Sequence, residues 1–332
     1  MLRQVVFVFM FIVCFFVLAA GTVSCGDFSS RVENLYKRFE QECLEKGWQR
    51  VDLRVNDLTR KILWKGPGGS WTNGAIITLH GGGGTYSNYC ANIRIGRPMV
   101  EFSEMAISEG FAVFSLESEE GFLRDQRGDS CGKRWLSMAI DNGANPDTVF
   151  IEKVIREIIP GLRPANSSKS IFMTGHSNGA FMTVLAATHL SDKIEAFAPV
   201  SGGDPYGIYV DCSEGSAFRH TPGKFYDRET KKPINEKDAC KSEKYTNEKS
   251  WPGKDSLNKP PFKLFYHLGD SVDDTSCKEK LKELLVRNGY SDAGSVILGD
   301  VDSTRWPLNH FWMDEYNRPL IDFFKKYARK PE

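Results

Sequence analysis

The chain has 332 residues, of which 41% are hydrophobic and 26% charged, the balance of an ordinary soluble globular protein. Its 43 basic and 43 acidic residues cancel to a formal net charge of zero, which argues against a nucleic-acid partner. No C-x-x-C pair and no spacing typical of a zinc site occurs, so we expect no metal site.

The N-terminus predicts a secretory signal peptide at residues 1–24. Arg3 precedes an apolar run of 16 residues from Val5 to Ala20, and small residues follow the run. The run is shorter than the roughly 20 apolar residues that a membrane span needs, and an uncleaved signal anchor is the alternative. We therefore expect a secreted, extracellular protein that makes no stable association with the membrane after signal cleavage.

The cysteines agree with an oxidising compartment. Cys14 leaves with the signal peptide, and seven of the eight cysteines remain. Secreted proteins use cysteines mainly as disulfides, so we expect bridges rather than free thiols. The sequence does not choose among the many possible pairings.

The predicted elements begin with an amphipathic helix at residues 29–46, where Ser30 and Glu33 form a capping box. Alternating residues from Val51 to Trp64 predict a β-hairpin. Short apolar runs then alternate with helical segments along the rest of the chain. We expect strands at 75–79, 111–116, 170–173, 194–200, 262–267 and 295–298, and helices near 98–109, 146–159, 180–190 and at the C-terminal end to about 327.

This alternation predicts a single α/β domain at residues 25–332, with a mostly parallel central sheet and helices on both of its faces. Residues 202–261 interrupt the alternation, because they are rich in glycine, proline and charge and show no period. An insertion of that length between late strands is either a solvated surface or a lid or cap over a site.

Residues 174–180 read TGHSNGA and contain the G-x-S-x-G pattern, with Ser177 at its centre. A predicted strand precedes the pattern and a predicted helix follows it, which is the context of a nucleophile elbow. Glycine on each side of the turn avoids a Cβ atom that would crowd the reversal. The alternative is a small residue in a tight turn, but the context favours Ser177 as a nucleophile.

His80 is followed by four glycines, directly after the predicted strand at 75–79. One interpretation is a flexible turn, and the other is a loop that stabilises an oxyanion. In the second case a free N–H of this loop acts together with that of Asn178, the residue after the nucleophile. One such donor stabilises a transition state by about 3–4 kcal/mol.

A serine nucleophile needs a base, and the base needs an acid that orients it. Among the six histidines, His310 follows the last predicted strand, where the chain order Ser–Asp–His places the base. Asp270 and Asp273 compete for the role of the acid. We prefer Asp270 because it directly follows the strand at 262–267, and Asp273 remains its rival.

With these features the chain resembles the α/β-hydrolase superfamily, and within it the secreted esterases that include feruloyl esterases, acetylxylan esterases and polyhydroxybutyrate depolymerases. The resemblance rests on ITLHGGGG at 77–84, NPDTVFIEKVI at 145–155, the stretch from TGHSNGA to VSGG at 174–203, and NHFW at 309–312. It implies catalytic roles for Ser177 and His310 and an oxyanion hole at Gly82 or Gly83 with Asn178.

The chain also departs from this family in three places. Asp270 follows Gly269 directly, where family members commonly place two residues between glycine and aspartate. Ala180 stands where a second glycine usually follows the elbow, and Asn309 precedes His310 where the family has glycine. The first departure bears on the choice between Asp270 and Asp273.

The expected activity is hydrolysis of carboxylic esters through an acyl-enzyme, without a cofactor, on an ester of the feruloyl or acetyl-carbohydrate type or a polyester. The partner would then be an ester substrate, such as a polymer or a plant cell-wall carbohydrate ester. Acyl transfer on the same triad is one alternative, and a non-catalytic secreted binding protein on a hydrolase scaffold is another. Five tryptophans are either core or a substrate platform: Trp71, Trp135, Trp251, Trp306 and Trp312.

Overall fold

The computed structural model describes residues 25–124, 130–137, 145–206, 225–226, 233–234, 251, 258–270, 272–273, 275–299 and 308–331. The expected signal peptide at 1–24 and most of the insertion at 202–261 lie outside these residues. Both therefore stay predictions.

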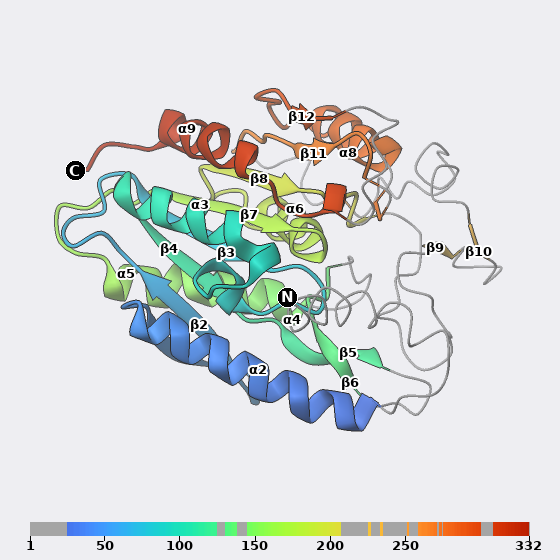
Figure 1. Ribbon diagram of the computed structural model, residues 1–332. Coiled ribbons are helices and arrows are strands. Elements are labelled where there is room, and N and C mark those ends of the chain that lie inside the picture. The colour runs from blue at the N-terminus through green and yellow to red at the C-terminus, as the bar shows by residue number, and fades with distance from the viewer. Residues whose placement is uncertain are drawn as a thin grey trace.

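An eight-stranded sheet forms the centre of the described part of the chain, in the order β1-β2-β4-β3-β7-β8-β11-β12 (Figure 1). Its strands are β1 (Gln49–Val55), β2 (Leu58–Lys65), β3 (Gly74–Leu79), β4 (Phe111–Leu116), β7 (Ile171–His176), β8 (Ala196–Val200), β11 (Phe265–His267) and β12 (Val296–Leu298). The hairpin β1–β2 and the pair β2–β4 are antiparallel. The other neighbours run parallel, which confirms the mostly parallel sheet.

Helices cover both faces of this sheet, as the sequence predicts (Figure 1). They are α2 (Cys25–Glu45), α3 (Arg97–Ser108), α4 (Pro146–Lys153), α5 (Ile159–Leu162), α6 (Asn178–His189), α8 (Thr275–Arg287) and α9 (Asn317–Tyr327). Helices α2, α3 and α9 share one apolar cluster with the sheet, and α4, α6 and α8 share the other. In the residues that the structure describes, no helix is both long and apolar enough to cross a membrane.

The central strands are buried on both faces, which explains their continuous apolar character. Every residue of β3 is buried. Ala75, Ile77 and Leu79 pack into one cluster, whereas Ile76 packs into the other. Strand residues alternate between the two faces of a sheet, so a strand covered on both sides is apolar throughout.

A second hairpin, which the sequence analysis did not predict, follows β4. It pairs β5 (Glu119–Arg124) with β6 (Ser130–Arg134) in antiparallel fashion. The segment is rich in charge and lacks the alternation that indicates a strand. The remaining short elements are β9 (Phe225–Tyr226), β10 (Pro233–Ile234), a π turn at Val154–Ile158, and the 3₁₀ turns η1 (Tyr86–Tyr89), η2 (Arg94–Gly96), η6 (Leu308–His310) and η7 (Asp314–Tyr316).

A disulfide between Cys43 and Cys90 ties α2 to the segment after η1. The two cysteines are 47 residues apart in the chain, and both are buried. Cys277 on α8 is disulfide-bonded as well. These bridges agree with the expectation that the cysteines pair, and a disulfide fits an extracellular protein.

Replacing both Cys43 and Cys90 with alanine should lower the free energy of unfolding by about 2–4 kcal/mol, because the disulfide restricts the unfolded chain over a long loop. Urea unfolding of the double variant, beside the oxidised wild type, measures this. The single variants Cys43→Ala and Cys90→Ala, which lack the bridge but each keep one of the two sulfur atoms, are the controls for the loss of sulfur from the core. An unchanged unfolding midpoint would contradict a stabilising role for this bridge.

Candidate active site

Ser177 lies at the tip of a sharp reversal between β7 and α6. Its backbone has φ 53° and ψ −121°, a combination that residues other than glycine rarely adopt. A Cβ atom on Gly175 would collide with the carbonyl of Gly179, and a Cβ atom on Gly179 would collide with the carbonyl of Leu79. Both glycines of the pattern are therefore required by the packing, and the strand–turn–helix context is present.

The position after the second glycine also fits. Ala180 is fully buried, and the nearest atom to a Cβ built on Gly202 would be the Cβ of Ala180. The extra methyl group of Ala180 is therefore accommodated by a glycine on the neighbouring loop. This departure from the family pattern leaves the turn intact.

Three side chains from separate parts of the chain meet at this turn. His310 Nε2 lies 2.8 Å from Ser177 Oγ. On the other side of the imidazole, His310 Nδ1 lies 3.0 and 2.9 Å from the two carboxylate oxygens of Asp270. A hydroxyl that donates to Nε2 and an Nδ1–H that donates to a carboxylate form the hydrogen-bond chain of a serine nucleophile with its base and acid.

His310 is held by its neighbours as well as by the carboxylate. His176, within the elbow, lies with its Nε2 2.7 Å from the carbonyl oxygen of His310 and donates to it. The amide of Asn309 donates to the carbonyl of Gly269 at 3.3 Å. The asparagine that replaces a family glycine thus ties the His310 loop to the loop that carries Asp270.

Asp270 is surrounded by hydrogen-bond donors. Its Oδ1 accepts from the backbone N–H groups of Val272 and Asp273, at 3.0 and 3.1 Å. Its Oδ2 accepts from the ammonium group of Lys278 at 2.8 Å. Burial raises the pKa of this carboxyl, but the charges and hydrogen bonds of His310 and Lys278 outweigh burial and hold the pKa well below its usual value.

The structure brings Asp270, and not Asp273, to the imidazole. Asp273 Oδ2 instead lies 3.5 Å from Lys278 Nζ, and its backbone carbonyl accepts from the same ammonium group. Asp270 is close to His310 because it ends the short turn that follows β11, where its N–H donates to the carbonyl of His267.

The glycine loop after β3 lies beside the elbow. A Cβ atom on Gly82 would be 3.7 Å from the Cβ of Asn178. The N–H of Gly83 donates to the carbonyl of Lys133 at 2.7 Å. Within the part of the chain that the structure describes, the N–H groups of Gly82 and Asn178 have no acceptor. Of the two glycines expected to stabilise an oxyanion, Gly82 is therefore the one with an available donor.

The side chain of Asn178 fixes the elbow to the segment after β6. Its Oδ1 accepts from the N–H of Trp135 at 2.8 Å. Its Nδ2 donates to the hydroxyl of Ser137 at 2.7 Å and to the carbonyl of Trp135 at 3.2 Å. The indole of Trp135 in turn donates to the carbonyl of His80 at 2.9 Å. The segment at residues 135–137 therefore contacts both parts of the candidate oxyanion hole, Asn178 and the residue that precedes the glycine loop.

A buried ion pair lies behind the glycine loop, and sequence reasoning did not find it. Glu117, directly after β4, accepts from Lys133 and from Thr85, each at 2.7 Å, and lies 3.1 Å from His80. Burial raises the pKa of Glu117, but Lys133 and His80 outweigh burial and leave it at about 2. No local pattern marks these residues, because the partners are far apart in the chain.

The tryptophans do not form the exposed platform that the sequence left open. Trp306 lies outside the described residues. The other four have exposed fractions of 5% or less and are core residues: Trp71, Trp135, Trp251 and Trp312. In the described residues, no group of three or more His, Cys, Asp or Glu side chains is placed to hold a metal ion.

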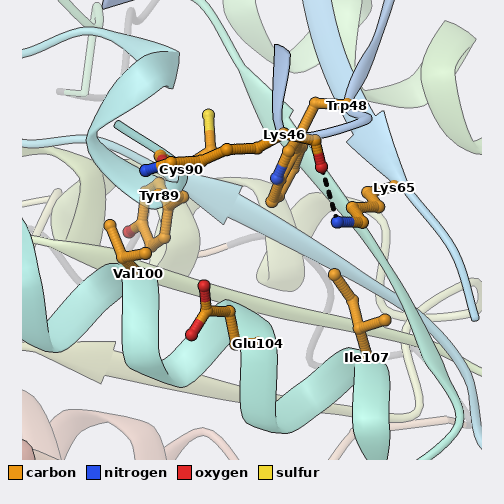
Figure 2. Close-up of a pocket in the computed structure, with 8 residues that line it drawn as sticks. All are labelled: Lys46, Trp48, Lys65, Tyr89, Cys90, Val100, Glu104 and Ile107. Atoms are coloured by element: carbon orange, nitrogen blue, oxygen red, sulfur yellow. Dashed lines mark hydrogen bonds between the residues drawn. The ribbon is translucent and has the colours of Figure 1, made fainter. Parts of the chain in front are cut away.

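A cavity of about 280 Å³ lies elsewhere, beside the Cys43–Cys90 disulfide (Figure 2). Its lysines are already engaged, since Lys65 Nζ donates to the carbonyl of Lys46 at 2.7 Å and Lys46 Nζ donates to the carbonyl of Cys90 at 2.8 Å. Neither Ser177 nor His310 lines it. This cavity is separate from the candidate active site.

The chain matches no protein-family model, and no curated protein is significantly similar to it. It does resemble solved structures. One is a thermostable esterase, with a TM-score of 0.51 and 14% identity over 85% of this chain. Another is the uncomplexed acylaminoacyl peptidase of Pyrococcus horikoshii, with a TM-score of 0.53 and 20% identity over 86% of this chain. The chain has the α/β-hydrolase fold.

The chain spans only 63% of the esterase and 42% of the peptidase. At these identities the likeness shows the fold alone. The parallel strand order, with Ser177 after a central strand and His310 after the last, accounts for the likeness in physical terms.

The pH dependence of the unfolding free energy tests whether His176 is buried as a neutral imidazole. Burial, together with the nearby His310, lowers its pKa from 6.5 to about 3. Between those values the unfolded chain binds a proton that the folded chain does not, so stability falls as the pH falls. His176→Gln keeps a donor to the His310 carbonyl and removes this proton.

We therefore expect the unfolding free energy of the wild type to fall more steeply than that of His176→Gln, by about 1.4 kcal/mol per pH unit between pH 6 and 4. Urea unfolding at three pH values measures the difference. Parallel curves for the two proteins would contradict the burial of a neutral imidazole at this position.

Proposed function

We propose that this protein is a secreted serine esterase that hydrolyses carboxylic esters through an acyl-enzyme. The observation that supports the proposal is the unbroken hydrogen-bond chain from Ser177 Oγ through His310 to Asp270, at 2.8 and 2.9 Å. A serine hydroxyl is a poor nucleophile near neutral pH, and this arrangement is the means by which it becomes a good one. Ser177 is also only partly buried, so it can meet a substrate.

In the first step, His310 takes the proton of Ser177 as the hydroxyl oxygen attacks the ester carbonyl. The imidazolium formed in this step is stabilised and kept in one orientation by Asp270. The alcohol leaves with the proton from His310. Water then attacks the acyl-serine with His310 again as base, and the acid is released with Ser177 restored.

The carbonyl oxygen gains negative charge in both steps. The N–H groups of Gly82 and Asn178 are the donors that we assign to this oxyanion, since both lack an acceptor within the described residues. Their positions are fixed before the reaction by the contacts of Trp135 with Asn178 and His80. Donors that need no rearrangement during the reaction stabilise the transition state most effectively.

Secretion and substrate class are parts of the same proposal. The apolar run at 5–20 followed by small residues supports a signal peptide, and the Cys43–Cys90 disulfide fits an extracellular protein. The sequence resemblance to secreted esterases favours a feruloyl or acetyl-carbohydrate ester, or a polyester, as substrate. The similar fold of a thermostable esterase supports the proposal that the cleaved bond is an ester.

Ser177→Ala should reduce the hydrolysis of p-nitrophenyl acetate, butyrate and octanoate by about 10⁴-fold or more, because the nucleophile is lost. Steady-state rates of the secreted protein measure this, with Ser108→Ala on the exposed end of α3 as the matched control. Feruloyl and acetyl-xylan esters, added as separate substrates, test the substrate class. Full activity in Ser177→Ala would overturn the assignment.

The choice of acid is tested by a pair of variants. Asp270→Asn should lower kcat by about 10⁴-fold, since the amide no longer holds the imidazole in its working tautomer. Asp273→Asn should keep kcat near pH 8 within about tenfold of the wild type, because Asp273 does not contact His310. Steady-state rates of the two variants at saturating p-nitrophenyl butyrate distinguish the two aspartates. The opposite order of effects would assign the acid to Asp273.

A further inference from the structure

Helix α2 contacts the glycine loop from a distant part of the chain. The hydroxyl of Tyr36, on α2, donates to the carbonyl oxygen of Gly83 at 2.7 Å, although the two residues are 47 positions apart. The helix precedes every strand of the central sheet and lies against β6 and η1 (Figure 1). The steps proposed for ester hydrolysis use no group of this helix, so its bond to the loop beside Ser177 requires an explanation.

Two peptide groups connect this hydroxyl to the N–H that we assign to the oxyanion. The carbonyl of Gly83 belongs to the same peptide group as the N–H of Gly84, and this N–H donates to the carbonyl of Gly81 at 3.0 Å. The carbonyl of Gly81 in turn shares its peptide group with the N–H of Gly82. A chain of hydrogen bonds therefore runs from the Tyr36 hydroxyl through two peptide groups to the N–H of Gly82.

Such a chain affects both the direction and the strength of its last donor. Each peptide group is planar, so a bond to its carbonyl also fixes the direction of its N–H. A donor at the carbonyl oxygen polarises the peptide group, and the bonds of a chain therefore strengthen one another. Gly82 itself is exposed, so a substrate can reach it. Donors that are oriented before the reaction stabilise an oxyanion most effectively.

The turn at Gly83 is held at both of its backbone polar groups. Gly83 has φ 71°, in the left-handed region that favours glycine. Its N–H donates to the carbonyl of Lys133 at 2.7 Å, and its carbonyl accepts from Tyr36. Lys133 Nζ also lies 5.1 Å from the centroid of the Tyr36 ring. The bend that directly follows Gly82 is therefore fixed by α2 and β6 together.

Helix α2 is also tied to the segment that follows the glycine loop. The disulfide between Cys43 and Cys90 joins the two covalently. In addition, the hydroxyl of Tyr86 donates to the carboxylate of Glu40 at 2.6 Å. These ties fix the helix relative to the loop, so the hydroxyl of Tyr36 is held in place for its bond to the loop.

We propose that Tyr36 is a positioning residue for the oxyanion hole, because its hydroxyl orients and polarises the N–H of Gly82 through two peptide groups. This inference rests on the proposed function, since it concerns the oxyanion formed in that reaction. The substrate oxygen carries more negative charge in the transition state than in the bound ester. Loss of the hydroxyl should therefore affect kcat more than KM.

The first test is the steady-state hydrolysis of p-nitrophenyl butyrate by Tyr36→Phe. We expect kcat to fall about tenfold and KM to stay within about twofold of the wild type. Tyr86→Phe is the matched control, since it removes the same group and one tie of α2 but no bond to the glycine loop. Its kcat should stay within about twofold of the wild type. Thermal unfolding of both variants checks that they fold.

The second test is inhibition by trifluoromethyl propyl ketone, which imitates the transition state. The Ser177 oxygen adds to the carbonyl carbon of the ketone, its proton passes to His310, and the carbonyl oxygen becomes an oxyanion. Tyr36→Phe should weaken the inhibition constant about tenfold, in parallel with kcat/KM. A tyrosine with a merely structural role would lower the thermal midpoint and leave both kcat and the inhibition constant unchanged.

A pair of unnatural side chains at position 36 separates the hydrogen bond from the packing, and it carries the test if Tyr36→Phe does not fold. p-Methylphenylalanine fills the space of the hydroxyl without a donor, and its kcat should fall about tenfold. p-Aminophenylalanine keeps a donor at the same place, and its kcat should stay within about threefold of the wild type. Both are introduced by nonsense suppression.

Three results would overturn the role of Tyr36: an unchanged kcat in Tyr36→Phe, an equal loss in Tyr86→Phe, or equal rates for the two unnatural side chains. Any of them in an active wild type would leave the proposed esterase function intact. A wild type that hydrolyses none of the esters would instead overturn the proposed function, and this inference with it.

Discussion

The crowded reversal of the chain at Ser177 is the constraint on which the rest of the site depends. The unfavourable backbone angles of this residue persist only because β7 and α6 are each packed into the core, with Gly175 and Gly179 allowing carbonyl groups to approach. The same reversal leaves Ser177 partly accessible and brings His176 to the carbonyl of His310. One local strain thus organises both residues.

Around this turn the protein relies on buried charges that are paired. Asp270 with Lys278, and Glu117 with Lys133, each place a carboxylate and an ammonium group largely out of contact with water. Such pairs contribute little net stability, but removing one partner is costly because the other is left buried and uncompensated. We interpret both pairs as devices that fix positions, one for the acid and one for the glycine loop.

The sequence predicted the parts of the fold that have a strong period. The strands and helices around Ser177 are found within a few residues of their expected places, because apolar runs in a parallel sheet are continuous. The hairpin β5–β6 was missed because its residues are charged and irregular. The tryptophans were left open as a platform, and burial decided against it, since aromatic residue type does not indicate which side of the surface a ring lies on.

The order of residues along the chain predicts only part of the site. Order and strand ends indicated Ser177 and His310, but Asp270 and Asp273 both follow β11, and only the turn geometry separates them. Lys278 has no sequence signal, because a buried lysine in the first turns of a helix looks like any solvated lysine. The pairing of Cys43 with Cys90 likewise depends on the packing of α2 against η1, which no spacing rule supplies.

The most direct test of the central claim is covalent labelling of the nucleophile. The secreted protein is treated with a fluorophosphonate, and the digested protein is analysed by mass spectrometry. The account predicts a single adduct, at one equivalent, on the peptide that contains Ser177, and none when Ser177 is replaced by alanine. An absence of labelling, or an adduct on another residue while ester hydrolysis continues, would contradict the account.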